Sequence, residues 1–422
     1  MNRIKQFGLQ TFSALKIRNY RLYFTGQGIS LCGTWMQSIG QSWLVLKLSG
    51  SGTTLGLVTA LQTLPVLLLG PWGGLVADRF RKRSILFCTQ SGAALLALIL
   101  GILVATHVVQ VWMVCVLATC LGLINTVDNP TRQTFVMEMV GKEYLTNAIT
   151  LNSSEINVAR VIGPAIAGAL IARAGMAPCF FLNALSYLAV LWMLFIMRVD
   201  ELQVTPPVAR AKGQLQEGFR YVLANPLLRT TLLMMAIIGT LTYEFQVSLP
   251  LLAQFTFHGN AATYAALTSA MGGGAVLGGL LIAGRRRQGP RLLVGMALLF
   301  GLVILIAALA PTLHLAVLAM IFVGVFSIAF TSLGNSTLQL NSAPEMRGRV
   351  MSLWTVAFLG STPIGGPIIG WLGEHVGPRW CLMVGGLAAL AAGAIGGLVL
   401  RKESRAASVL PEAPASALET DD

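Results

Sequence analysis

The sequence feature that most constrains the fold is a series of apolar blocks, separated by short stretches rich in Gly, Pro and charged residues. Each block is about 20 residues long, the length of α-helix that crosses a hydrocarbon core of ~30 Å. Segmentation by hydropathy predicts about twelve membrane spans, with boundaries good to a few residues. They cover roughly residues 22–46, 54–76, 85–106, 110–130, 147–172, 178–197, 229–252, 263–284, 291–310, 313–335, 348–373 and 379–400. The sequence therefore predicts an all-α polytopic membrane protein.

Composition excludes the water-soluble classes of protein. Of the 422 residues, 55% are hydrophobic and only 11% are charged, whereas a soluble domain carries about 25% charged residues. Soluble globular, secreted disulfide-rich and disordered chains are therefore excluded. The six cysteines lie in or beside apolar segments, without CxxC pairs or metal-ligand spacing. We expect them to be small buried hydrophobic residues, and we expect no metal and no cofactor.

The net charge of +13 has two interpretations. Nucleic-acid binding is one, but no basic stripe interleaves with aromatic residues, so we expect no nucleic-acid partner. The other is membrane topology, because inner-face loops of membrane proteins carry excess Lys and Arg. With the N-terminus inside, the inner loops, inner span ends and tails hold 25 of the 29 basic residues. The others are Lys47, Arg173 and Arg379 in outer loops and Arg160 within a span. We therefore expect both termini in the cytoplasm.

The spans fall into two sets, which divide the chain into five segments. The first segment mixes apolar and basic residues, and we expect a short helix on the cytoplasmic membrane surface. Residues 214–223 read as an amphipathic helix that ends before Asn225-Pro226. The tail is rich in Ala, Ser, Pro and Glu, and we expect it to be disordered. The segments are 1–21 (N-terminal amphipathic segment), 22–197 (first six-helix bundle), 198–228 (cytoplasmic linker), 229–400 (second six-helix bundle) and 401–422 (tail).

The two sets of spans resemble each other at a nearly constant offset. The Gly-Gly-Leu of residues 73–75 recurs at residues 278–280, and the Ile-Gly of residues 162–163 recurs at residues 364–365. A repeat of six plus six spans is typical of duplicated transporters, whose substrate site lies between the halves near the bilayer midplane. A single six-helix channel or a membrane enzyme needs no such repeat.

The loop between the second and third spans carries the most specific motif. Residues 74–83 read Gly-Leu-Val-Ala-Asp-Arg-Phe-Arg-Lys-Arg, with Arg81 where a second Gly is usual. With the repeat, this segment resembles the major facilitator superfamily. Within it, the chain resembles the branch of enterobactin exporters and macrolide-efflux proteins, through residues 18–23, 42–46, 128–133, 159–164 and 225–229. The resemblance implies a major facilitator fold, with 12 transmembrane helices in two pseudo-symmetric six-helix bundles, in a bacterial inner membrane.

The resemblance also implies a function. It implies a monomeric secondary transporter that exports an amphipathic small molecule, a drug or a siderophore, in exchange for protons. The sequence shows no catalytic constellation, and Gly-rich residues 271–274 lack the Lys-Ser/Thr of a phosphate-binding loop, so an ion gradient must drive transport. Two alternatives stay open. One is a metabolite importer or facilitator of the same fold, and the other is a membrane enzyme or receptor that transports nothing.

Charged residues at the inner span ends form a predicted cytoplasmic lock. A carboxylate there can cap a helix and pair with basic residues across the gap between the halves. The resemblance implies that the lock stabilises the outward-open state, and that Asp128 belongs to it rather than carrying the proton. The alternative is a loop whose basic residues only enforce topology. The lock comprises Asp78, Arg79, Lys82, Arg83, Asp128 and Arg132.

Three ionisable residues lie deep in predicted spans: Glu155 and Arg160 in the fifth, and Glu244 in the seventh. A charge at the bilayer centre costs at least ~2.5–3.5 kcal/mol, so each needs a partner or water. Glu155 and Arg160 lie about 140° apart around a helix and cannot form a same-face pair. We predict that Glu155 and Glu244 couple transport to protons, and that Arg160 modulates them or contacts an anion. Permanently paired structural charges are the alternative.

Uncharged polar residues form stripes on three spans. Such a row would be costly against lipid, so we expect it to face a central cavity, which the resemblance places beside these spans. Hydrogen bonding between helices is the alternative. The stripes are Gln27, Ser30, Thr34, Gln37 and Gln41 on the first span, Thr240, Glu244 and Ser248 on the seventh, and Ser327, Thr331 and Asn335 on the tenth.

The fifth span also carries a run of small residues around a proline. Gly163, Pro164 and Gly168 resemble the antiporter motif of the superfamily. Small residues let helices approach closely, and the proline removes one backbone hydrogen bond. The motif favours export over uptake, with plain tight packing as the alternative.

Overall fold

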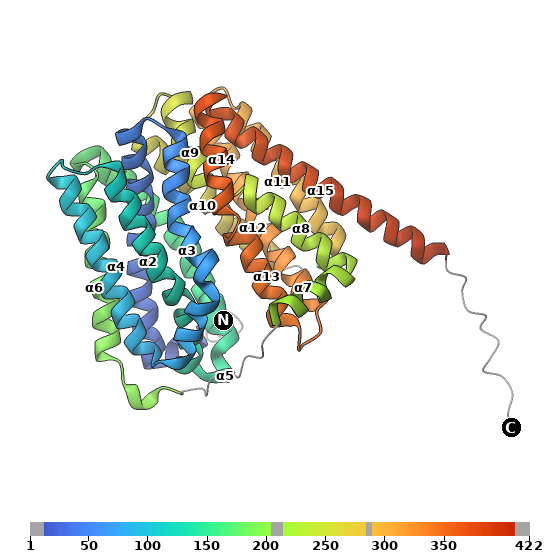
Figure 1. The fold of residues 1–422 in the computed structure, drawn as a ribbon, viewed down its shortest axis with the longest axis horizontal. Coiled ribbons are helices and arrows are strands. Elements are labelled where there is room, and N and C mark those ends of the chain that lie inside the picture. Colours follow the sequence, from blue (N-terminus) through green and yellow to red (C-terminus); the bar gives the residue numbers. More distant parts are fainter. Residues whose placement is uncertain (1–11, 204–213, 284–288, 410–422) are drawn as a thin grey trace, which may run out of the picture.

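The computed structural model describes residues 12–203, 214–283 and 289–409, and this part of the chain contains helices and no strands. The long helices form two bundles that lie side by side (Figure 1). The predicted all-α fold is confirmed.

The N-terminal bundle is built from α2 to α6, with a short 3-10 helix at each end. Its elements are η1 (Ser13–Lys16), α2 (Arg18–Ser49), α3 (Gly52–Arg79), α4 (Lys82–Ala105), α5 (Val111–Ala174), α6 (Ala177–Ile196) and η2 (Val199–Glu201). Within α5, Gly141 has φ 69° and ψ −176°, which is not helical. Glycine adopts this backbone conformation without a steric penalty. α5 therefore consists of two membrane-spanning helices that meet at Gly141.

The C-terminal bundle contains two spans that are interrupted. Its elements are α7 (Gln214–Ala224), α8 (Pro226–Leu241), α9 (Phe245–Leu251), the π-helix η3 (Leu252–Thr256), α10 (Ala261–Ala283), α11 (Pro290–Leu309), α12 (Leu313–Leu340), α13 (Arg347–Leu359), α14 (Thr362–His375) and α15 (Pro378–Val409). α8, α9 and η3 together form one span, and α13 and α14 form another. The two breaks fall at residues 242–244 and 360–361.

Ten segments of the described chain are long and apolar enough to cross a membrane. One of them is the whole of α5, which contributes two spans because it breaks at Gly141. α2 is not among the ten, although it has 32 residues. Its row of Gln, Ser and Thr side chains lowers its hydropathy. Counting α2 and the two parts of α5, the structure has the twelve spans that the sequence predicts.

Two segment boundaries differ from the predicted ones. α2 begins at Arg18, four residues inside the predicted surface segment, and the Ala14 N–H donates to Asn147 Oδ1 on α5 at 2.9 Å. Residues 13–16 thus pack on the N-terminal bundle, while residues 1–11 lie outside the described part of the chain. α15 continues to Val409 because residues 401–409 include Arg, Lys, Glu and Ala, which favour helix. The predicted disordered tail is therefore helical up to residue 409, and residues 410–422 are not described.

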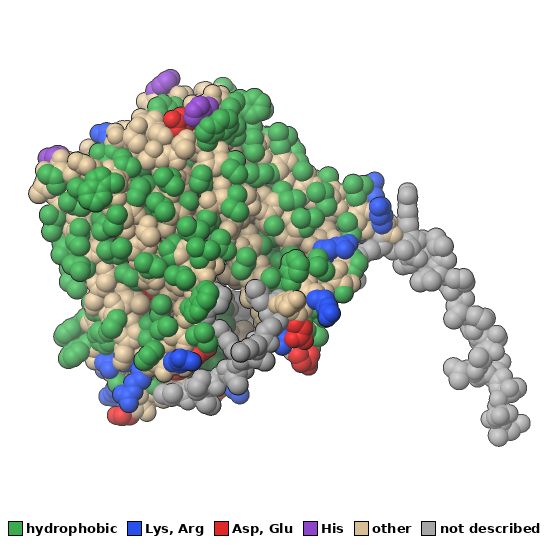
Figure 2. Space-filling model, viewed as in Figure 1, with side chains coloured by type: hydrophobic (Ala, Val, Ile, Leu, Met, Phe, Trp, Pro, Cys, Tyr) green, Lys and Arg blue, Asp and Glu red, His purple; other side chains and the backbone are tan. Residues whose placement is uncertain are grey.

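The two ends of the bundles differ in charge (Figure 2). Lys and Arg side chains gather at one end, here called the basic face, which holds the ends of α3, α6 and α12 and the starts of α2, α4 and α8. The four histidines lie in or beside loops at the other end, here called the histidine face. The basic face is the one that charge bias predicts to be cytoplasmic.

Close backbone contacts join the two bundles toward the histidine face. Gly52 of α3 lies against Gly370 of α14, and one turn further along Gly56 lies against Gly366. A Cβ atom added at any of the four would collide with the backbone of the opposite helix. Beside them, Glu374 Oε2 accepts hydrogen bonds from Ser51 Oγ at 2.6 Å and from the Thr53 N–H at 3.0 Å. The histidine face is therefore closed by contacts between the bundles.

Candidate functional site

The basic residues at the start of α4 bind within the N-terminal bundle. Lys82 Nζ lies 2.7 Å from Glu138 Oε1 on α5, and both side chains are largely buried. Arg83 Nε donates to the Leu194 carbonyl oxygen of α6 at 2.8 Å. These contacts hold α4 against its own bundle. Lys82 and Arg83 therefore do not bridge the two bundles in this structure.

The other predicted members of the loop lie at the end of α3. Asp78 and Arg79 form the last turn of that helix. The N-cap position of α4 is Arg81, whose side chain makes no capping hydrogen bond.

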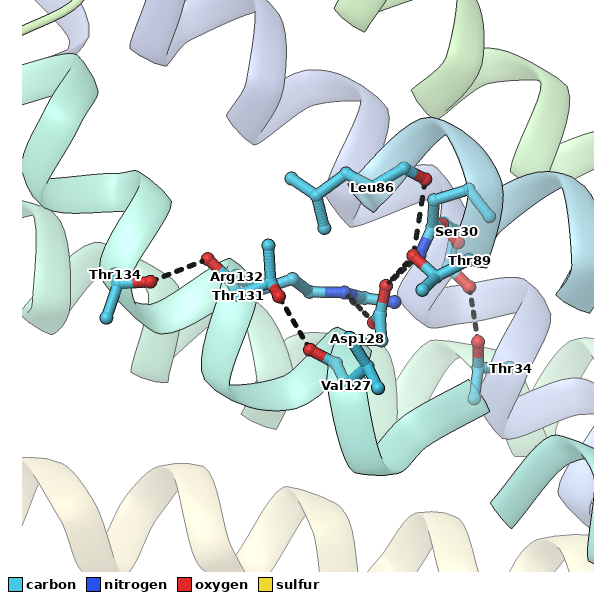
Figure 3. Close-up of polar contacts among 10 residues, drawn as sticks. Ser30, Thr34, Leu86, Thr89, Val127, Asp128, Thr131, Arg132 and Thr134 are labelled. Carbon is cyan, nitrogen blue, oxygen red and sulfur yellow. Dashed lines mark hydrogen bonds and ion pairs between the residues drawn. The ribbon is translucent and has the colours of Figure 1, made fainter. Parts of the chain in front are cut away.

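Asp128 is the centre of a buried polar cluster in the N-terminal bundle (Figure 3). Its Oδ1 accepts hydrogen bonds from Thr89 Oγ1 at 2.6 Å and Gln90 Nε2 at 2.8 Å, and its Oδ2 pairs with Arg132 Nε one turn along α5. Asp128 is only 1% exposed. All of these partners of the carboxylate lie within the N-terminal bundle. Asp128 and Arg132, both members of the predicted lock, thus pair with each other, while Lys82 pairs with Glu138.

Replacing Asp128 with asparagine is expected to lower the free energy of unfolding by about 3–5 kcal/mol, because Arg132 would be left as an uncompensated buried charge. Chemical unfolding in detergent micelles measures the change. The matched control is Glu201→Gln, which breaks an exposed ion pair with Arg198 at 3.0 Å and should cost less than about 1 kcal/mol. Equal costs for the two variants would contradict the structural role assigned to Asp128.

The polar stripe on α2 divides into two parts. Thr34, Gln37 and Gln41 line a cavity of about 130 Å³, in which Gln37 Oε1 accepts from Asn183 Nδ2 at 2.6 Å and Gln41 Nε2 donates to Gln62 Oε1 at 3.1 Å. Gln27 and Ser30, nearer the basic face, are buried and do not line it. Both have a side-chain oxygen without a hydrogen-bond partner among the described residues.

The polar stripes of the C-terminal bundle do not line this cavity. Their hydroxyl groups bind their own helix or a neighbour instead. Thr240 donates to Ala236 O, Ser327 donates to the Tyr243 hydroxyl at 3.0 Å, and Thr331 donates to Ser327 O. Asn335 accepts from Gln339, and Ser248 is buried. These contacts are of the kind that the alternative describes, hydrogen bonds within and between helices.

Glu155 is a buried carboxyl group that packs on the backbone of α2. A Cβ atom on Gly28 would lie 2.6 Å from Glu155 Oε1, so the absence of a side chain at residue 28 makes room for the carboxyl group. Glu155 is 8% exposed, and its Oε2 has no hydrogen-bond partner among the described residues. Arg160, five residues further along the same helix, stacks on the Trp35 ring instead.

Glu244 lies where two interrupted spans meet. It is the N-cap of α9, directly after the break that follows α8. A Cβ atom on Gly365 would lie 2.9 Å from Glu244 Oε1, so the carboxyl group packs against α14 just beyond the break that separates it from α13. Glu244 is 3% exposed, and Oε1 has no hydrogen-bond partner among the described residues. Broken helices at mid-membrane depth are typical of ion and substrate sites in transporters.

Arg160 is held by an aromatic ring. Its guanidinium carbon lies 5.0 Å from the centroid of the Trp35 ring on α2. Its Nε is buried without a hydrogen-bond partner, and no carboxylate pairs with it among the described residues. A cation–π contact contributes about 0.5–2 kcal/mol, less than the ~2.5–3.5 kcal/mol that a charge costs at mid-membrane depth. The ring alone does not offset the cost of this charge.

The small residues of the fifth span face two different helices. A Cβ atom on Gly163 would lie 2.6 Å from Trp35 Cβ on α2, within the same bundle. A Cβ atom on Gly168 would lie 2.7 Å from Ala265 Cβ on α10, in the other bundle. Pro164 is buried inside α5. This run therefore sets both the packing of α5 on α2 and the contact between the bundles.

Sequence reasoning missed four polar residues that the structure brings to these sites. Glu138 was assigned to a loop, because the predicted fourth span ends at residue 130 whereas the helix continues to residue 140. Gln62, Asn183 and Gln246 line the cavity, each from a different helix. The available signal was a lone amide side chain within an apolar span, which is costly unless it is paired.

Comparisons with known proteins agree with this architecture. A family model described as transmembrane secretion effector matches residues 9–420. The chain is 25% identical over 349 residues to the staphyloferrin A transporter of Staphylococcus aureus, covering 79% of this chain and 84% of that protein. It is 26% identical over 425 residues to the enterobactin exporter EntS of Shigella flexneri, covering 98% and 99%.

The fold is shared with solved transporter structures. An inward-facing bacterial homologue of the human lysosomal transporter Spinster superposes with a TM-score of 0.72, at 16% identity over 94% of this chain and 98% of that one. The relatives are transporters, which removes the enzyme or receptor alternative. The chain therefore belongs to the transmembrane secretion effector family of the major facilitator superfamily of membrane transporters.

Proposed function

We propose that this transporter exports an amphipathic small molecule, a siderophore or a drug, across the bacterial inner membrane in exchange for protons. It works as a monomer with the basic face and both termini in the cytoplasm. Support for the direction and the substrate class comes from the relatives, since one that spans 98% of the chain is named an enterobactin exporter. The excess of Lys and Arg at the basic face supports the orientation.

Proton coupling is supported by a pair of buried carboxyl groups, one in each bundle. Glu155 packs on α2 and Glu244 on α14, and each has an oxygen atom without a hydrogen bond among the described residues. A buried carboxyl group is cheaper when it is neutral, so a bound proton suits these surroundings. When the bundles move apart, water or a cation reaches the group and favours release. Each group can thus take up and give back one proton per cycle.

The arrangement of contacts between the bundles supports alternating access. Glycine backbones and Glu374 close the histidine face. At the basic face, Lys82, Arg83 and Arg132 bind within the N-terminal bundle. We assign this arrangement to the state that is open toward the cytoplasm. In the opposite state the predicted lock residues at the basic face would exchange these partners for groups of the other bundle.

Transport into inside-out vesicles tests the proposal. An acidic vesicle interior should drive accumulation of iron-free enterobactin or staphyloferrin A, and a protonophore should abolish it. Vesicles without the transporter are the control. Accumulation that survives the protonophore would refute proton exchange, and gradient-driven accumulation only in right-side-out vesicles would establish the importer alternative.

A further inference from the structure

Trp35 connects a buried cation to a neutral polar cavity. The Arg160 guanidinium stacks on its ring, and the same side chain forms part of the wall of the 130 Å³ cavity. α2 places the two features side by side, because Trp35 follows Thr34 of the cavity-lining stripe and packs against Gly163 of α5, one turn from Arg160. A cation and a set of hydrogen-bonding groups therefore meet at one aromatic side chain.

Arg160 lies at the junction of the two bundles. Its backbone carbonyl lies next to Gly272 of α10, in the C-terminal bundle. A guanidinium group carries five N–H donors in a planar fork that fits a carboxylate. Since Arg160 has no carboxylate partner among the described residues, this fork is available to a ligand.

The cavity itself is polar but carries no charge. Its described walls present the amides of Gln37, Gln41, Gln62 and Asn183 from the N-terminal bundle and Gln246 from the C-terminal bundle. Amides supply donors and acceptors together. A volume of about 130 Å³ is below the ~300–1,000 Å³ of pockets that enclose a drug-sized ligand. The cavity thus fits one ring or one short arm of a ligand.

We infer that Arg160 and Trp35 form an anion-binding subsite, which holds a carboxylate or similar planar organic anion of the transported molecule, while the amide-lined cavity holds a neutral hydrogen-bonding arm next to it. This inference rests on the proposed function and gives its substrate class as an organic anion with hydroxyl or amide groups. It predicts that the transporter binds an anionic ligand more tightly than a neutral ligand of the same shape, because only the anion pairs with the guanidinium group.

Two small probes of nearly equal shape test the preference. Salicylate carries a carboxylate on a hydroxylated ring, and salicylamide is its neutral counterpart. Binding of each to the purified full-length transporter in nanodiscs is followed by saturation-transfer NMR of the probe. We expect a Kd at least tenfold lower for salicylate, loss of that difference in Arg160→Gln, and partial retention in Arg160→Lys. Trp35→Leu should weaken salicylate binding as well.

The matched control is Arg173→Gln, which removes a positive charge from an exposed position at the far end of the same helix. This variant should keep the full preference for salicylate. Equal binding of the two probes to the unsubstituted protein, or binding of neither, would overturn the inference whether or not the variants fold. A preference that survives in Arg160→Gln would also overturn it. None of these outcomes decides proton-driven export, because the assay involves neither a gradient nor vesicles.

Discussion

Replacing either Glu155 or Glu244 with glutamine should reduce gradient-driven accumulation in inside-out vesicles at least tenfold, to the level reached without a gradient. Glutamine has nearly the shape of glutamic acid, so the packing on α2 or α14 is kept. It cannot exchange a proton, however, and therefore mimics the protonated group permanently. Exchange of labelled for unlabelled substrate at equal pH should continue, because that exchange needs no net movement of protons.

The control for this prediction is Glu143→Gln, which removes an exposed carboxylate at the basic face from the same long helix. It should leave accumulation within twofold of the unsubstituted protein. If Glu155→Gln and Glu244→Gln both accumulate substrate normally at equal expression, neither residue carries the proton. If only one variant fails, the coupling site lies in that bundle alone, and the other carboxyl group is structural.

A valine at Gly370 should block transport by a different route. The Cβ atom of any side chain at residue 370 would collide with the backbone carbonyl of Gly52, which cannot rotate away as a side chain would. Overpacking of this kind costs typically 1–3 kcal/mol. The cost falls only on the state in which the histidine face is closed, so the two-state population shifts by about 5–150-fold toward the opposite state. We expect accumulation to fall at least tenfold.

Cysteine labelling separates this conformational effect from unfolding. Thr59, which lines the cavity on α3, is 9% exposed here. In a background without the native cysteines, Thr59→Cys should react faster with an impermeant maleimide, added from the histidine face, when Gly370→Val is present. The matched control is Gly273→Val, at a glycine with no atom within 4 Å of its added Cβ position. Normal transport by Gly370→Val would show that closure of the histidine face is not part of the cycle.

The buried charges divide into satisfied and unsatisfied groups, and this division separates structure from mechanism. Asp128 has two hydrogen bonds and an ion pair, and Glu138 has Lys82. These groups stabilise the N-terminal bundle. Glu155, Glu244 and Arg160 each keep one buried polar atom without a hydrogen-bond partner among the described residues. Burying an unpaired polar atom of this kind lowers the free energy of unfolding. Proteins keep such groups where the group binds a proton or a ligand.

Most of the fold could be predicted from the sequence because membrane spans depend on local composition. Transfer of about 20 apolar residues from water to hydrocarbon is favourable, and each residue contributes its own share of the free energy. The result does not depend on which helices lie beside the segment. The offset repeat and the excess of Lys and Arg in alternate loops are likewise properties of the chain alone. The breaks within the spans could not be predicted in this way. Nothing local marks residues 242–244 as a break after α8, because the break is compensated by contacts with α14.

The sequence by itself thus determined that the chain has twelve spans, two related bundles and a deep set of ionisable residues. Only the tertiary structure decided which partner each charged group has: Arg132 for Asp128, Glu138 for Lys82, and the Trp35 ring for Arg160. It also decided that Thr34, Gln37 and Gln41 of α2 line the described cavity, while the polar stripe of α12 does not. The physical reason is that pairing depends on how each helix is rotated and shifted against its neighbours. Those two quantities are determined by packing between segments far apart in the chain, and a side chain's own position does not reveal them.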